Sequence, residues 1–258
     1  RRVRQSGYSG LFIRVFGSDA FADPVRAFDN IAHAIAAFER TAVFGQYTSK
    51  FDAVIAGRVG FTELERKGEE VFLQMGCADC HPLRPVGGGT PQPGTDFSYH
   101  NIGVPKNPEN RFYRMDADLN PAGGDFVDAG LGGVFPEGSK DRADQWGKHK
   151  TPSLRNVALT APYGHNGYFN TLRGVVEFYS TRDLKQCREK QGAPIELSEE
   201  QALRDGCWPA PEVAANVDRE IRGGGVAMGR MGLAPEEIDA VVAFLKTLTD
   251  GWRPSLRF

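Results

Sequence analysis

The feature that most constrains this chain is a single Cys-x-x-Cys-His motif, Cys77-Ala-Asp-Cys80-His81. Two cysteines one helical turn apart, followed by a histidine, are typical of haem c attachment: the thiols bond the porphyrin and the histidine ligates the iron. A zinc site would need two further ligands at compatible spacing, and the sequence has no second C-x-x-C. A thioredoxin-like redox pair would need a βαβ pattern, which is absent. The motif therefore predicts one covalent haem c, held by Cys77, Cys80 and His81.

The composition fits a globular protein of one large domain or two small ones. The 258 residues are 40% hydrophobic and carry a formal net charge of −2, so the chain can bury a sizeable core. This net charge shows no excess of basic residues of the kind that nucleic-acid-binding proteins carry. No apolar run approaches the roughly 20 residues that a membrane helix needs. The 31 glycines and 16 prolines indicate long loops.

Helical patterns lie on both sides of a long irregular region. Asp23 before Pro24 and Thr62 before Glu63 are expected N-caps, and Gly251 is expected as the C-cap of the last helix. Between residues 82 and 147 there is little periodicity, which is typical of loops that wrap a ligand. The predicted fold is mainly α with long loops and little β-structure, and its helices are expected at 24–42, 63–75, 171–180 and 235–248.

The motif does not determine the sixth ligand of the iron. Methionine would raise the reduction potential, whereas a tyrosine phenolate would stabilise ferric or higher iron. Besides the seven tyrosines, the residues with suitable chemistry are Met75, Met115, Met228, Met231, His100, His149 and His165. The residues by themselves leave this choice open.

Four further segments resemble the bacterial dihaem cytochrome c peroxidase and MauG family, in the same order along the chain. They are 150–167 with Thr171-Leu172, which resembles the family's signature, 31–41, 97–103 and 241–248. The resemblance implies a cytochrome c-like haem domain at 61–258, and the end of an N-terminal haem domain with a linker helix at 1–60. A dihaem enzyme needs two C-x-x-C-H motifs and this chain has one. The resemblance therefore implies that the first haem domain lies upstream, has been cleaved, or is a separate chain.

Within this family the second haem takes its distal ligand from the helix that follows the signature. Aligning Thr171-Leu172 with the family's Thr-Leu places Tyr179 at the ligand position, where ordinary peroxidases have Met and the MauG branch has Tyr. The chain thus resembles the MauG branch, in which peroxide-derived oxidising equivalents oxidise residues of a partner protein. The alternative is that Tyr179 is a core tyrosine on an apolar helix face.

Three functions are compatible with these residues. The first is a MauG-like dihaem enzyme that oxidises a protein partner. The second is a dihaem peroxidase that reduces hydrogen peroxide with electrons from a donor cytochrome or cupredoxin. The third is a monohaem electron-transfer subunit. The expected partner is therefore a protein electron donor or a protein substrate, and the dimers of the peroxidase branch leave a homodimer open.

The resemblance also implies a calcium ion between the haem domains, bound by backbone carbonyls at the positions of Thr160 and Pro162. Oxygen ligands suit Ca²⁺, but the family's third protein ligand, an Asn, has no counterpart that we can place. Cys187 and Cys207 flank a polar insertion, and a disulfide between them is expected instead of two free thiols. Haem c proteins mature outside the cytoplasm, where disulfides persist, which predicts a periplasmic location.

Overall fold

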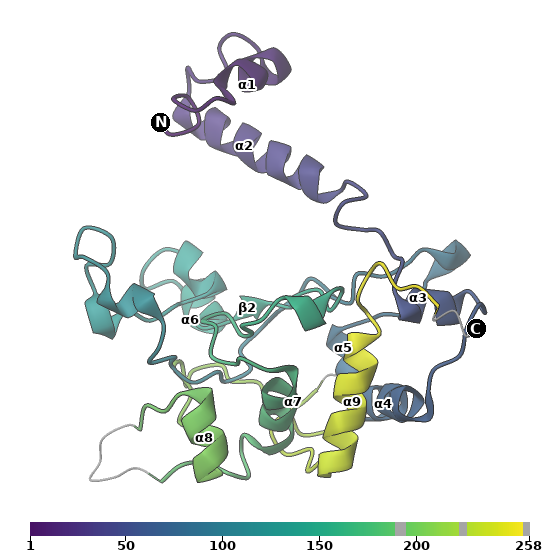
Figure 1. Cartoon of the computed structure of the whole chain (residues 1–258). Coiled ribbons are helices and arrows are strands. Elements are labelled where there is room, and N and C mark those ends of the chain that lie inside the picture. The colour runs from purple at the N-terminus through teal and green to yellow at the C-terminus, as the bar shows by residue number, and fades with distance from the viewer. Residues whose placement is uncertain (189–194, 222–225, 255–258) are drawn as a thin grey trace. The chain divides into compact units, whose positions relative to one another are not determined.

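The computed structural model describes residues 1–188, 195–221 and 226–254 and divides the chain into two compact units, Arg1–Gln46 and Tyr47–Phe258 (Figure 1). The described part is mainly helical with one two-stranded sheet, which confirms the predicted fold class. Its α-helices are α1 (Ser9–Phe16), α2 (Pro24–Glu39), α3 (Lys50–Ile55), α4 (Glu63–Gln74), α5 (Cys77–Cys80), α6 (Lys140–Gln145), α7 (Leu172–Thr181), α8 (Glu199–Asp205) and α9 (Pro235–Lys246). Short 3₁₀ turns are η1 (Gly87–Gly89), η2 (Arg111–Arg114), η3 (Gly123–Asp125), η4 (Leu131–Val134) and η5 (Val157–Leu159), and the strands are β1 (Tyr99–His100) and β2 (His149–Lys150).

The first unit is built from α1 and α2. The Asp23 side chain caps α2 by accepting hydrogen bonds from the backbone N–H groups of Val25 and Arg26, at 2.7 and 3.2 Å. Phe12 is buried, with its ring 4.7 Å from that of Phe16 and 4.8 Å from that of Phe21. The expected N-cap is thus confirmed, although the helix ends at Glu39, a few residues earlier than the apolar pattern predicts.

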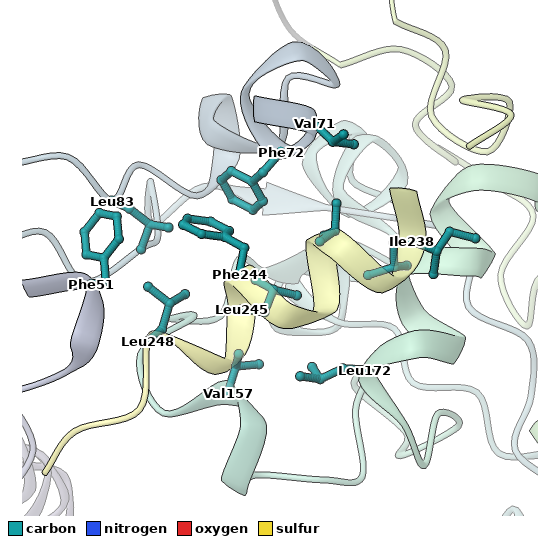
Figure 2. Close-up of a cluster of buried hydrophobic side chains, with 12 residues drawn as sticks. Phe51, Val71, Phe72, Leu83, Val157, Leu172, Ile238, Phe244, Leu245 and Leu248 are labelled. Atoms are coloured by element: carbon teal, nitrogen blue, oxygen red, sulfur yellow. The ribbon is translucent and has the colours of Figure 1, made fainter. Parts of the chain in front are cut away.

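The core of the second unit forms where α4 crosses α9. A Cβ added at Gly68 would lie 1.9 Å from the carbonyl oxygen of Ala240, so only glycine permits this close approach of the two helices. Beside the crossing, the rings of Phe72 and Phe244 lie 5.3 Å apart. Figure 2 shows the surrounding cluster, which is made of Phe51, Val71, Phe72, Leu83, Val157, Leu172, Val176, Ile238, Val241, Phe244, Leu245 and Leu248.

Helix α3 packs into this same core. The ring of Phe51 lies 6.0 Å from that of Phe244. The neighbouring Asp52 accepts two hydrogen bonds from Arg155, at 2.8 and 2.9 Å. The boundary between the two compact units therefore lies between Gln46 and Tyr47.

The end of α9 differs from the prediction. The helix ends at Lys246 with Thr247 as its C-cap, so the expectation that Gly251 caps it was wrong. Gly251 lies beyond the helix, where its N–H donates to the Thr48 hydroxyl at 2.9 Å. A helical pattern followed by glycine does not show where the last intrahelical hydrogen bond forms. Here the Gly251 N–H bonds to Thr48 instead of to a carbonyl of the helix.

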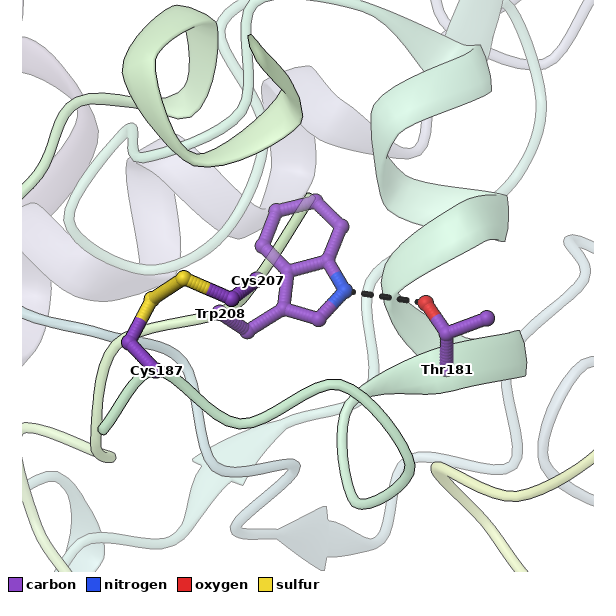
Figure 3. The surroundings of a disulfide bond; sticks show 4 residues. All are labelled: Thr181, Cys187, Cys207 and Trp208. Atoms are coloured by element: carbon purple, nitrogen blue, oxygen red, sulfur yellow. Dashed lines mark hydrogen bonds between the residues drawn. A yellow bond between two sulfur atoms is a disulfide. The ribbon is translucent and has the colours of Figure 1, made fainter. Parts of the chain in front are cut away.

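The expected disulfide joins Cys187 to Cys207 (Figure 3). The backbone N–H of Cys187 donates to the Trp208 carbonyl at 2.9 Å. The buried Trp208 indole in turn donates to the Thr181 hydroxyl, at the end of α7, over 2.9 Å. The disulfide segment is therefore anchored to α7. Among the described residues, no helix is both long and apolar enough to span a bilayer.

Candidate haem site

A cavity of about 410 Å³ lies beside the Cys-x-x-Cys-His motif. Its walls come from α4, α5, the β1–β2 region, the loop after β2, α7 and α9. Most of the lining is apolar, with Val71, Phe72, Leu172, Val176 and Leu245 also belonging to the hydrophobic core. An apolar cavity in contact with a few convergent polar groups is the ordinary setting of a cofactor site.

The motif itself forms the short helix α5 at the edge of this cavity. Gly76 adopts the left-handed conformation, with φ of 70°, and so separates α4 from α5. Cys77, Cys80 and His81 all line the cavity, and neither cysteine is in a disulfide. Burial raises the pKa of the Cys77 thiol to about 12. Reactive redox cysteines have lowered pKa values, so this environment disfavours thiol exchange.

The hydrogen bonding of the His81 ring favours the tautomer that a metal ligand needs. Its Nδ1 lies 2.9 Å from the Gly94 carbonyl oxygen, which can only accept, so Nδ1 carries the proton and Nε2 is left as the ligating atom. Burial lowers the pKa of His81 and thus favours the neutral imidazole that binds metal. The residues of the motif therefore fit a haem c.

Tyr179 lies on α7 and lines the same cavity as His81. Among the described residues, no group forms a hydrogen bond with its hydroxyl. Burial raises the pKa of this phenol, the Cys77 and Cys80 thiols raise it further, and the Arg182 cation acts in the opposite direction. The structure thus brings together the two residues that sequence reasoning assigned to the two faces of the haem.

The other sixth-ligand candidates differ in their surroundings. Met75, Met228 and Met231 line the cavity, whereas Met115 is 45% exposed and does not. His100 has both ring nitrogens engaged, Nδ1 with Asp218 at 2.9 Å and Nε2 with Ser98 at 2.7 Å. His100 is therefore a poor candidate. The cavity-lining methionines remain alternatives to Tyr179, as does His149, whose buried Nε2 has no hydrogen-bond partner among the described residues.

His149 and His165 stack on each other at the cavity wall, with ring centroids 3.8 Å apart and planes 3° from parallel. With Asp128 they form a cluster of ligand atoms within 4.8 Å of one another. A metal binds imidazole close to the ring plane at about 2 Å. Two parallel rings cannot both offer in-plane nitrogens to one ion, so this arrangement is a stacked pair rather than a metal centre.

Thr160 and Pro162 follow η5 and lie at the surface beside the cavity. No described residue donates a hydrogen bond to either carbonyl oxygen. The Thr160 hydroxyl donates to the Val157 carbonyl at 3.2 Å. Two open carbonyls are chemically suitable for Ca²⁺.

Sequence reasoning did not find Gly94, whose carbonyl sets the His81 tautomer. It also did not find Arg182, whose side chain donates hydrogen bonds to backbone carbonyls of the cavity wall. Gly94 lies 13 positions from His81 in an irregular loop. No periodicity or motif marks such a partner, because the contact is made by a backbone carbonyl and depends on the loop path alone.

The fold and the cavity fit a c-type haem domain. Residues 1–60 match the family profile described as di-haem cytochrome c peroxidase. The chain is 39% identical to the methylamine utilization protein MauG of Paracoccus denitrificans over 248 residues, which cover 94% of this chain and 57% of that protein. It is 34% identical to the cytochrome c551 peroxidase of Nitrosomonas europaea over 171 residues, which cover 66% of this chain and 41% of that protein.

A solved structure shows the same fold. The diheme peroxidase BthA of Burkholderia thailandensis superposes with a TM-score of 0.64 at 27% sequence identity, over 97% of this chain and 58% of that one. The chain belongs to the MauG and dihaem cytochrome c peroxidase family. It spans little more than half the length of MauG and less than half that of the Nitrosomonas peroxidase.

Proposed function

We propose that this chain is the part of a MauG-like dihaem enzyme that carries a haem c ligated by His81 and Tyr179. The observation that carries the proposal is the position of Tyr179 in the same cavity as His81, with its hydroxyl unengaged by any described residue. The identity of 39% to a MauG supports the same reading. In this proposal, oxidising equivalents derived from peroxide pass to a protein partner.

The chain's own residues would divide the work as follows. Cys77 and Cys80 hold the porphyrin through thioether bonds, and the Gly94 carbonyl keeps His81 in the tautomer that binds iron. Tyr179 must lose its proton to ligate, and burial opposes this loss. A phenolate in this apolar cavity therefore needs a neighbouring cation to stabilise it, and a bound haem iron would be that cation. When bound, the haem supplies a one-electron redox centre.

We assign residues 1–60 to the end of an N-terminal haem domain and its linker, and residues 61–258 to the second haem domain. The match of residues 1–60 to the family profile supports this division, and the packing of α3 extends the second unit back to Tyr47. The disulfide supports a periplasmic location, since such bonds persist outside the cytoplasm.

A second candidate function is hydrogen peroxide reduction with electrons from a donor cytochrome or cupredoxin. Met228 favours it: this residue is buried, lines the cavity and precedes Gly229, whose N–H donates to the Tyr179 carbonyl at 2.8 Å. A methionine next to the proposed ligand offers the ligation that would raise the reduction potential.

Spectroscopy of the ferric, haem-loaded protein tests the choice. We expect near-infrared magnetic circular dichroism and resonance Raman spectra of His–Tyr ligation. In the whole dihaem enzyme, we expect protein-partner oxidation to exceed donor-cytochrome oxidation when peroxide is added. Spectra of His–Met ligation, together with rapid oxidation of a reduced donor cytochrome, would contradict the proposal and support the peroxidase.

Calcium removal gives a separate expected result. We propose that the open carbonyls of Thr160 and Pro162 bind Ca²⁺, so a chelator should lower the melting temperature of the haem-loaded protein and added Ca²⁺ should restore it. An ion at 100 times its dissociation constant stabilises by about 2.7 kcal/mol. Mg²⁺ is the control, because it demands a tighter octahedral set of ligands. An unchanged melting temperature and no calcium by elemental analysis would refute the site.

A further inference from the structure

Arg182 is a buried cation at the C-terminal end of α7, three residues after Tyr179. Only 3% of the residue is exposed. Its guanidinium forms two parallel hydrogen bonds with the Asp183 carboxylate, from Nε at 2.8 Å and from Nη2 at 2.9 Å. This pairing neutralises the charge, and it leaves further N–H groups to be satisfied.

Those remaining donors reach three backbone carbonyls that lie between 36 and 80 positions from Arg182 in the sequence. The acceptors are the carbonyl oxygens of Ile102 at 2.8 Å, Asp218 at 3.1 Å and Met228 at 3.1 Å. Ile102 and Met228 line the cavity. One side chain thus ties two parts of the cavity wall to the end of the helix that carries Tyr179.

The Met228 segment is also bound directly to the last turn of α7. The N–H of Gly229 donates to the Tyr179 carbonyl at 2.8 Å, and the N–H of Gly232 donates to the Ser180 carbonyl at 3.1 Å. The φ of Gly229 is +86°, and a Cβ there would lie 2.9 Å from Arg182 Nε. A side chain at position 229 would collide with Arg182, so this segment can follow its path only with glycine there.

We propose that Arg182 is the positioning residue for Tyr179, clamping the segments at Ile102, Asp218 and Met228 onto the end of α7 so that the cavity wall around the phenol keeps one arrangement. This inference rests on the proposed ligation by Tyr179. The clamp also holds Met228, the competing ligand, through its backbone.

The chemistry of the contacts requires arginine. The planar guanidinium reaches a bidentate carboxylate and three carbonyls at once, with Nη1 donating to Ile102 and the two N–H groups of Nη2 shared among Asp183, Asp218 and Met228. Lysine has three donors on one nitrogen and cannot span these acceptors. Asp183 balances the charge of Arg182. The main role of Arg182 is therefore to hold the backbone segments in place.

The test compares Arg182→Lys with Arg155→Lys in the haem-loaded protein. Arg155 is a matched control, since its side chain is 7% exposed and pairs with Asp52, at 2.8 Å, outside the Tyr179 wall. In Arg182→Lys we expect hydrogen exchange of peptides covering 226–233 to be faster by about tenfold or more, as a local opening becomes easier. The fraction of His–Tyr-ligated haem should fall as well. Arg155→Lys should change neither readout.

Unchanged exchange at 226–233 and unchanged ligation in Arg182→Lys would overturn the inference. If Arg182→Lys does not fold, Asp183→Asn takes its place: faster exchange at 226–233 supports the clamp and unchanged exchange refutes it. Tyr179→Phe separates this inference from the proposed function. If that variant leaves the spectrum unchanged, ligation by Tyr179 fails, whereas exchange still reports on the clamp.

Discussion

Replacing Tyr179 by phenylalanine is expected to abolish His–Tyr ligation and to slow oxidation of the protein partner by at least about 100-fold, more than the loss typical of residues that only support a metal ligand. Phenylalanine keeps the ring in the apolar cavity but removes the oxygen that no described residue engages. Resonance Raman spectra of the ferric protein should lose their phenolate modes, and the reduction potential should rise because a phenolate stabilises ferric iron.

Tyr168→Phe is the matched control for this substitution. Tyr168 is 1% exposed, its hydroxyl is buried without a hydrogen-bond partner among the described residues, and it is outside the cavity lining. Removing an unsatisfied buried hydroxyl is close to neutral or stabilising. An equal loss of activity in both variants, or an unchanged spectrum in Tyr179→Phe, would contradict the assignment of Tyr179 as the iron ligand.

The double substitution Cys77→Ala with Cys80→Ala is expected to yield protein without covalent haem and with severely reduced stability. The cavity of about 410 Å³ borders the main core, where Cys77 and Ala78 pack against the buried cluster. Without haem, the apolar side chains that line this cavity lose their packing partners, which lowers the stability of the domain. Haem content and near-ultraviolet circular dichroism measure both effects.

The second cysteine pair is the control for that experiment. Cys187→Ser with Cys207→Ser removes a bond that closes a sequence separation of 20 residues, away from the cavity lining. The expected loss is about 3 kcal/mol, with haem retained. Equal haem content in both double variants would show that Cys77 and Cys80 do not attach the cofactor.

Local signals in the sequence account for much of the fold. Asp23 and Thr62 are N-caps as predicted, because a capping side chain bonds backbone groups only two or three residues away. The haem motif was recognisable for the same reason, since all its residues lie within one turn. Leu172–Thr181 forms α7 close to the bounds that its apolar face predicts.

Contacts between distant segments were beyond sequence reasoning. The two-residue strands pair His100 with His149 and have no pattern long enough to detect. The carbonyl partners of Arg182 lie 80, 36 and 46 positions from it, and nothing in the sequence around Arg182 marks them. The structure also narrowed the choice of sixth ligand by engaging His100 and leaving Met115 outside the cavity.

The central proposal is that this chain would hold one haem c on Cys77 and Cys80, with His81 as an iron ligand. The most direct test is the covalent haem content of the purified chain, measured by pyridine haemochrome and by peptide mass spectrometry. The claim predicts one haem per chain, borne by the peptide that contains both cysteines. No haem, haem that extracts into acidic solvent, or haem on another peptide would contradict it.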